Sequence, residues 1–270
     1  MRLTFALMIS GILSIVGLGI SAETSADSNT KMVTIDKSVL EDSLIKGFGD
    51  GWKTAKGKWE NVDGSIKGTE VKEDMHGAVS RHDANFTDGV VSFNFKLDGT
   101  KGISLSLNAT KGHICRVAIK PTGFSVVKDS QDKKAGDKAM VLASSDIVIK
   151  AGEWHSMVLE LQGPNMVATL DGKTTILGTH LAVEKPKANL GFTVSGESAS
   201  FRDLKVSSGT LSKNWDKTKD ALLKSNKYAY ISHPKRRMHS AIKQNAFFYF
   251  YHESVPISFS WLSQLPPLIH

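Results

Sequence analysis

The chain has 270 residues, of which 40% are hydrophobic, and a formal net charge of +7 at pH 7. The positive charge is concentrated at the C-terminus, where residues 227–270 contain five Lys or Arg against the single acidic residue Glu253, so the middle of the chain is nearly balanced and no nucleic-acid-binding surface is expected. The only cysteine, Cys115, excludes an intramolecular disulfide, so a hydrophobic core must stabilise the fold.

The N-terminus has the features of a secretory signal peptide. Arg2 precedes an uncharged apolar run from Leu3 to Ile20, and the small residues Ser21 and Ala22 follow. Gly and Ser residues interrupt the run, which favours a cleaved signal over a retained anchor of about 20 apolar residues. We therefore expect residues 1–22 to be removed and the protein to be secreted or periplasmic. The mature chain has no transmembrane segment, and peripheral association with the envelope stays open.

The body of the chain shows the alternation that is typical of strands with one buried face. Residues 23–37 are polar and aperiodic, which predicts a flexible arm. Over residues 38–208 a period-2 pattern recurs, for example at Phe93, Phe95 and Leu97. Strands are predicted at 92–97, 103–108, 115–120, 124–128, 155–162, 166–171, 189–195 and 200–206, with turns such as Asp98-Gly99 and Ser195-Gly196 between them. Because no crossover helices separate these strands, we predict an all-β, antiparallel jelly-roll β-sandwich.

The end of the chain departs from this pattern in two steps. Residues 209–226 have helical character with few apolar positions, which predicts a short C-terminal helix capping one end of the sandwich. The tail, residues 227–270, changes from basic at His233–Arg237 to aromatic at Phe247–Tyr251. It is either a segment that binds a membrane surface or a partner, or an irregular, poorly ordered sequence outside the fold, such as the translation of an altered reading frame.

Any function is expected on a polar sheet face. The sequence contains no Gly-rich phosphate loop, no zinc-type Cys or His motif and no nucleophile elbow. Residues two apart in a strand share a face, and hydroxyl, amide and cationic side chains on one face suit sugar hydroxyls. We place this face on the sheet that holds the strands near 92–97, 103–108 and 113–120. The candidate substrate-binding residues are His76, Arg81, Asn94, Lys96, Ser106, Asn108 and Lys120. A merely solvated sheet surface is the alternative.

Three residues are provisional catalytic candidates. His113 can transfer a proton near neutral pH, Glu70 supplies a carboxylate and Arg116 can hold an anion. A structural, hydrogen-bonded histidine is the alternative. The Glu-x-Asp-x-x-Glu string of jelly-roll glucanases is absent, which disfavours a retaining glucanase.

No cofactor and no metal site is predicted, and only a structural calcium ion stays open. Asp63, Asp98 and Asp171 lie in turns that could supply oxygen ligands. Asp-Gly turn chemistry explains the same residues equally well.

Four strings carry a resemblance to a bacterial family. They are Trp59–Gly68, Gly152–Ser156, Met166–Lys173 and Ser200–Val206. In this order they resemble the 3-keto-disaccharide hydrolase-like domain of the concanavalin A-like lectin/glucanase, or laminin-G-like, superfamily, over residues 45–207.

The resemblance implies a secreted or periplasmic protein that handles sugars, with a saccharide or glycan as its partner. Two functions stay open, an exported carbohydrate-binding or interaction module and a hydrolase or lyase acting on (3-keto-)glycosides. A structural role in an envelope assembly is a third.

Overall fold

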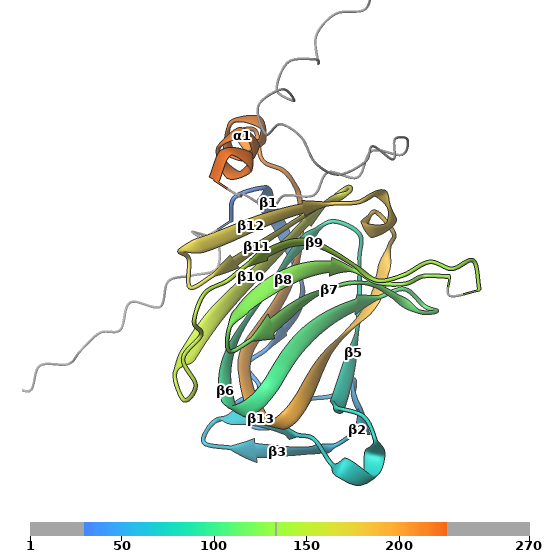
Figure 1. Cartoon of the computed structure of the whole chain (residues 1–270), viewed down its shortest axis with the longest axis vertical. Helices are drawn as coiled ribbons and strands as arrows, with labels where there is room; N and C mark the ends of the chain where they lie inside the picture. Colours follow the sequence, from blue (N-terminus) through green and yellow to red (C-terminus); the bar gives the residue numbers. More distant parts are fainter. Residues whose placement is uncertain (1–29, 133, 226–270) are drawn as a thin grey trace, which may run out of the picture. The chain divides into compact units, whose positions relative to one another are not determined.

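The computed structural model describes residues 30–132 and 134–225 (Figure 1). The expected signal peptide at 1–22, the first part of the arm at 23–37 and the tail at 227–270 lie outside the described residues. The described residues form one antiparallel sheet of thirteen strands. The strands are β1 (Val33–Asp42), β2 (Trp52–Lys56), β3 (Lys58–Val62), β4 (Ser65–Thr69), β5 (Ala78–Phe86), β6 (Gly89–Asn108), β7 (His113–Lys120), β8 (Gly123–Lys128), β9 (Met140–Ser145), β10 (Trp154–Gln162), β11 (Asn165–Leu170), β12 (Thr174–Thr179) and β13 (Lys187–Leu211).

Within the described residues, two short 3-10 helices and one α-helix accompany the sheet. They are η2 (Lys72–Asp74), η3 (Leu181–Val183) and α1 (Trp215–Ser225). The short C-terminal helix predicted from the sequence is therefore confirmed in α1. Among the described residues, no helix has the length and apolar character needed to cross a membrane.

The two longest strands, β6 and β13, are folded over rather than straight. They pair with each other over most of their length and lie side by side on a curved path (Figure 1). The rings of Phe192 and Phe201, nine residues apart in β13, stack with their centroids 4.2 Å apart. Nine fully extended residues would span about 30 Å. The strand therefore bends sharply between these two rings.

Glycines in both strands mark the bend. Gly99 in β6 and Gly196 in β13 have φ angles of 75° and 92°, and the pairing of the two strands shifts register around them. The sequence predicts chain-reversing turns at Asp98-Gly99 and Ser195-Gly196, and this prediction was wrong. Both pairs are bulges inside a continuous strand, where an extra residue and a left-handed glycine increase the local bend.

The bend divides the sheet into two facing layers. The β10 layer, in the order β12-β11-β10-β6-β13-β1, uses the first half of β6 and the second half of β13. The β7 layer, in the order β9-β8-β7-β6-β13-β5-β2, uses the other two halves. The jelly-roll sandwich predicted from the sequence is confirmed. Residues 92–97 belong to the β10 layer, however, so the prediction that they share a sheet face with 103–108 and 113–120 was wrong.

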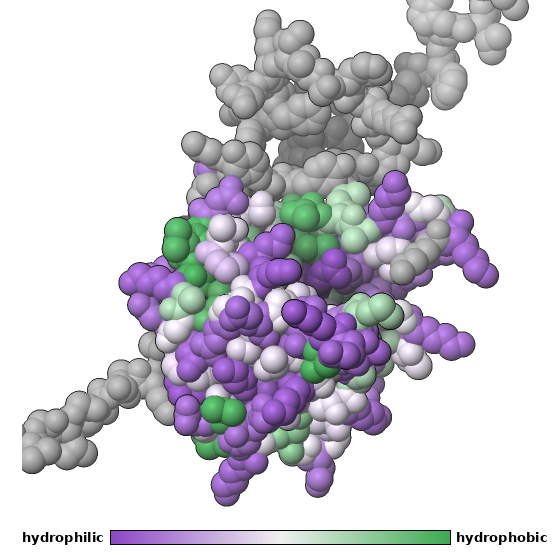
Figure 2. Space-filling view, turned by 60° about the horizontal axis from the view of Figure 1, so that its bottom comes forward, coloured by the Kyte–Doolittle hydropathy of each residue, from purple (hydrophilic) through white to green (hydrophobic). Residues whose placement is uncertain are grey.

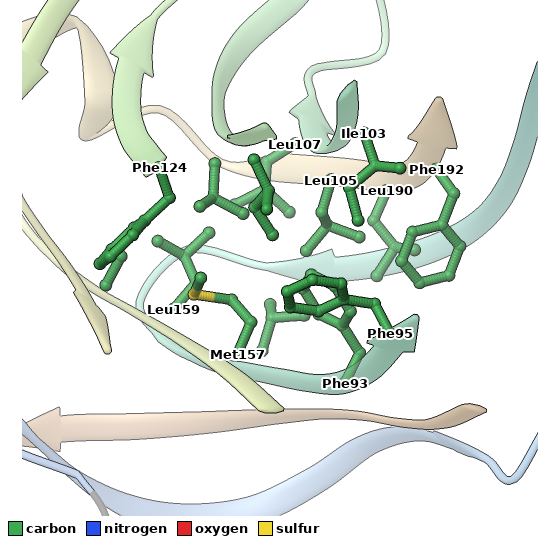
Figure 3. Packing of buried hydrophobic residues seen from close by; sticks show 14 of the residues in the cluster. Phe93, Phe95, Ile103, Leu105, Leu107, Phe124, Met157, Leu159, Leu190 and Phe192 are labelled. Atoms are coloured by element: carbon green, nitrogen blue, oxygen red, sulfur yellow. The ribbon is translucent and has the colours of Figure 1, made fainter. Parts of the chain in front are cut away.

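The core lies between the two layers and contains the apolar positions that alternate along each strand (Figure 3). Phe93 of the β10 layer meets Phe192 of the β7 layer with ring centroids 5.4 Å apart. Each large apolar side chain that is fully buried contributes about 1.5–3 kcal/mol relative to exposure. Because Ile103, Leu105 and Leu107 point inward, the residues between them point out of the β7 layer. The surface seen in Figure 2 is mainly hydrophilic with scattered apolar residues.

The outer face of the β10 layer is partly covered by a second apolar cluster. Its buried members are Met32, Val33, Val90, Val158, Val167, Leu177 and Trp215, the first residue of α1. Glu160 of β10 lies beneath this cover, with its side chain fully buried. Its carboxylate accepts the backbone N–H groups of Lys31, Met32 and Val33 at 2.7–2.8 Å. Burial raises the pKa of Glu160, and the three N–H donors act in the opposite direction.

These contacts hold the described part of the predicted arm, residues 30–37, against the β10 layer. The sequence predicts a flexible segment over 23–37, but β1 begins at Val33 and pairs with the end of β13. Glu160 alternates with the core residues Leu159 and Leu161 and is itself buried, on the outer face of the β10 layer. Its carboxylate, which accepts three backbone N–H groups, holds the N-terminal segment against the sheet.

Candidate functional site

Polar side chains from four neighbouring strands meet on the outer face of the β7 layer. Arg81 of β5 lies opposite Gly191 of β13, and Gly191 lies opposite Ser106 of β6. Ser106 in turn lies opposite Arg116 of β7. Because directly paired residues share a face, these four residues form a row across the sheet.

The row borders a hollow of about 200 Å³ that we call the polar cavity. Its lining residues are His76, Val79, Arg81, Ser104, Ser106, Asn108, His113, Arg116, Gly191 and Thr193. Gly191 allows Arg81 and the backbone of Ser80 to approach β13 closely, since a Cβ there would lie 2.7 Å from the carbonyl oxygen of Ser80 and 2.9 Å from Cγ of Arg81. No carboxylate lines the cavity among the described residues.

A chain of hydrogen bonds orients His113 at the cavity edge. Asn108, which is buried, donates through Nδ2 to Oδ1 of Asn189 at 2.8 Å. Its own Oδ1 is then the acceptor that lies 2.6 Å from Nδ1 of His113. His113 therefore donates from Nδ1, and Nε2 of the neutral ring carries the lone pair. The hydrogen bond fixes the orientation of the ring at the edge of the polar cavity.

The buried carboxylate of Asp129 forms an ion pair with Arg116. Nη1 of Arg116 lies 2.5 Å from Oδ1 of Asp129, whose side chain is 4% exposed against 34% for the arginine. Burial raises the pKa of Asp129, while Arg116, His113 and Lys128 act in the opposite direction. The other carboxylate oxygen of Asp129 is buried and has no hydrogen-bond partner among the described residues. The ion pair fixes one edge of the guanidinium and leaves the cavity with a positive group of defined position.

Most of the site residues predicted from the sequence converge in this cavity. His76, Arg81, Ser106, Asn108, His113 and Arg116 all line it, and Lys120 lines the neighbouring hollow on the same face. His76 donates through Nδ1 to the carbonyl of Gly77 at 2.8 Å.

Three predicted site residues lie elsewhere. Glu70 accepts the backbone N–H of Gly196 and does not line the polar cavity. Asn94 donates to Asp203 at 2.8 Å, and Nζ of Lys96 lies 5.5 Å from the ring centroid of Trp154. Asn94 and Lys96 belong to the first half of β6, which the bend carries into the β10 layer, and therefore do not join the cavity.

Other cavity residues were missed as site residues. Thr193 and Ser104 alternate with core positions, so the strand pattern itself contained the signal for them. Gly191 had no such signal, nor did Asp129, which pairs with Arg116 outside the cavity lining, because both roles depend on arginines in other strands.

The turn aspartates considered for calcium are separated from one another in the structure. Asp171 bonds to Nδ1 of His155 and to the backbone N–H of Ser156, whereas Asp98 accepts from Ser200. Asp63 lies in the turn between β3 and β4. Within the described ranges, no group of three His, Cys, Asp or Glu side chains is arranged to hold a metal ion.

Comparison with solved structures supports the fold. The chain is similar to a Crh5 transglycosylase with a TM-score of 0.51 and 11% identity, over 65% of this chain and 86% of that one. It is also similar to the carbohydrate-binding module CBM66 from Bacillus subtilis (TM-score 0.48, 17% identity, 58% and 96% of the two chains). A third is a non-specific endo-beta-1,3(4)-glucanase of family GH16 (TM-score 0.49, 11% identity, 65% and 93%).

At 11% identity, the similarity to the transglycosylase concerns the jelly-roll fold alone. Residues 45–207 match the family described as the 3-keto-alpha-glucoside-1,2-lyase-like domain. The chain belongs to this family, as its sequence resemblance indicated. No protein of curated function matches the chain significantly.

Proposed function

We propose that the domain binds a saccharide in the polar cavity. The observation that carries this proposal is the convergence of six sequence-predicted polar residues, from His76 to Arg116, around one hollow. Ser104, Ser106 and Thr193 supply hydroxyl groups that both donate and accept, as sugar hydroxyls do. Arg81 and Arg116 add donors on two sides.

Calorimetric titration of the full chain with a panel of glucosides, disaccharides and 3-keto-glucosides tests this proposal. Arg81 is exposed, so Arg81→Gln should leave the fold intact and weaken saccharide binding about tenfold, as expected for a hydrogen bond to a charged donor. Lys205→Gln, which changes an exposed lysine of the β10 layer, should have no effect. If no saccharide binds, or if Arg81→Gln binds as well as the unchanged protein, the proposal is wrong.

A second candidate function is 1,2-elimination at a 3-keto-glucoside, and the oriented His113 favours it. His113, oriented by Asn108, would remove the proton at C2, which is acidic because it lies next to the C3 ketone. The C2–H electron pair then forms a C1=C2 double bond, the C1–O bond breaks, and the leaving oxygen takes up a proton. Arg116 would stabilise the enolate oxygen. Hydrolysis by a pair of carboxylates is not supported, because the described residues that line the polar cavity include no carboxylate.

The product distinguishes the two candidates. Elimination generates a conjugated enone, which absorbs in the ultraviolet, from a 3-keto-glucoside. His113→Gln should abolish this absorbance change while retaining binding of a non-reactive glucoside. Binding without any enone in the unchanged protein would reject elimination and leave a binding module.

We infer that the protein acts after export. The N-terminal pattern of Arg2 followed by the apolar run Leu3–Ile20 supports this. Expression in a bacterial host followed by mass spectrometry should find the periplasmic or secreted protein starting near Ala22 or Glu23. An intact N-terminus retained in the cell would contradict export.

A further inference from the structure

Two further hollows continue the polar cavity along the same face of the β7 layer. The second, of about 350 Å³, shares Ser104, Arg116 and Thr193 with the polar cavity. The third, of about 270 Å³, shares Ala118 and Lys120 with the second. We call the three together the cross-strand groove, because the shared residues make them continuous.

The floor of the cross-strand groove is a row of small side chains. Successive pairing partners across β13, β6, β7, β8 and β9 are Thr193, Ser104, Ala118, Ser125 and Ser144. At a strand spacing of about 4.8 Å, five strands extend the floor over about 19 Å. Large side chains in this row would fill the groove, whereas the small ones leave it open and offer hydroxyl groups along it. The length suits a ligand of several sugar units.

The lining of the groove is strongly biased toward positive charge. Arg81 and Arg116 line its first part, and the exposed Lys101 and Lys120 line its second part. Asp146, in the third hollow, is the one acidic residue in the three linings that the structure describes.

Two more carboxylates lie close to the groove and are already engaged. Asp129 is paired with Arg116, and Glu70 bonds to Gly196 beside the lining residue Ser195. Charges of one sign in a hollow reinforce one another and attract an anionic ligand.

We propose that the cross-strand groove binds an acidic oligosaccharide, a chain whose sugar units carry carboxylate or sulfate groups, lying across the strands. The inference rests on the proposed saccharide binding in the polar cavity and adds the ligand's charge and length. The hydroxyls of the floor bond to sugar hydroxyls, and Lys101 and Lys120 pair with the acidic groups. A nucleic acid fits less well, since the described lining offers no exposed Trp, Tyr or Phe for base stacking and the ring of Phe124 is buried.

The test compares ligands that differ in charge alone. The full chain is titrated with an oligogalacturonate of about six units and with its methyl ester, and in a second arm with sulfated and unsulfated maltohexaose. We expect each charged form to bind about tenfold more tightly than its neutral counterpart. Added salt should reduce the difference, because exposed charge pairs are screened.

Matched variants assign the effect to the groove. Lys101→Gln/Lys120→Gln should weaken binding of the charged forms about fivefold, since each exposed ion pair contributes little on its own, and should weaken binding of the neutral forms much less. Lys173→Gln/Lys205→Gln removes the same charge from exposed residues of the β10 layer and should change neither. Both double variants retain the Lys and Arg residues of 227–270. Any attraction of the charged ligands to that segment is therefore the same in both.

Four results would overturn the inference. Equal binding of charged and neutral forms, with an effect of Arg81→Gln on both, would leave the proposed function standing and reject the acidic ligand. Equal loss of binding in the groove and control variants would assign the charge preference to overall charge. A single-stranded oligonucleotide that binds as tightly as the acidic oligosaccharides would show a general polyanion site. Absence of all saccharide binding would reject the proposed function as well.

Discussion

At the residue scale, Gly191 determines the shape of the polar cavity by having no side chain. The space above it is taken by Arg81 and by the carbonyl of Ser80. Gly191→Ala should destabilise the fold by about 1–3 kcal/mol, the usual cost of overpacking, and should displace Arg81 from the cavity.

Urea unfolding and saccharide titration of the same variant measure both effects. Gly49→Ala is the matched control, because its Cβ would lie 3.4 Å from Oδ2 of Asp42, an ordinary contact. Unchanged stability and binding in Gly191→Ala would show that β5 and β13 separate easily, against the tight packing that we describe.

The pairing of Asp137 with the buried Lys128 predicts a pH-dependent contribution to stability. The backbone N–H of Gln131 and the ammonium of Lys128 lower the pKa of Asp137 from 3.8 to about 2. Because the folded-state pKa is depressed, the contribution is complete above pH 3.8 and is lost as the pH falls toward 2. Asp137→Asn should therefore lower the free energy of unfolding near neutral pH and have a smaller effect at about pH 2.

Urea denaturation of both proteins at the two pH values tests this sign. Asp220→Asn, at an exposed position of α1, serves as the control. An equal effect of Asp137→Asn at both pH values would contradict the charge-dependent explanation.

At the scale of elements, Glu160 attaches the N-terminal segment to the β10 layer. Glu160→Gln keeps the shape but turns one acceptor oxygen into an NH₂ donor, which cannot accept the N–H groups that now bond to it. Leaving a buried N–H without a partner costs about 1–3 kcal/mol. We expect a loss of that size in chemical denaturation, together with faster hydrogen exchange at Met32 and Val33.

The exposed Glu153 gives the control for this loss. Its pair with Lys150 has side chains that are 58% and 70% exposed, so Glu153→Gln should change stability little. Slow exchange at Met32 and Val33 in Glu160→Gln would show that the apolar cluster around Trp215 holds the segment without the carboxylate.

At the scale of the whole molecule, Cys115 reports on the integrity of the sandwich. Its thiol is fully buried, and burial raises its pKa to about 12. A thiolate is the reactive form, so a thiol reagent should modify the folded protein very slowly and the unfolded protein rapidly. The labelling rate should rise with urea in parallel with the loss of near-ultraviolet circular dichroism.

Cys115→Ala provides the blank for this measurement, since it removes the chain's single thiol. Rapid labelling in the absence of urea would mean that β7 opens locally without global unfolding. In that case the floor of the cross-strand groove would be mobile as well, because β7 contributes Ala118 to it.

The sequence by itself determined the strand class, the inward and outward positions and most of the polar cavity. These follow from local chemistry, because alternation along a strand separates Leu105 and Leu107 from Ser106 and Asn108 whatever the rest of the chain does. The same rule predicts that Arg116 faces outward, and in the structure it lines the polar cavity. The rule does not account for His113, which has the parity of the inward-facing Cys115 and reaches the cavity because the pairing of β6 and β7 shifts register between Leu107 and Asn108.

Tertiary structure alone decided which faces come together. A glycine in a turn and a glycine in a bulge have the same local signature, so Gly99 and Gly196 could not reveal that β6 and β13 continue through them. The resulting bend sends Asn94 and Lys96 to one layer and Ser106 and Asn108 to the other. The burial of Glu160 and Asp129 and the close approach of Arg81 and Ser80 to Gly191 likewise depend on residues distant in sequence, which meet only in the folded chain.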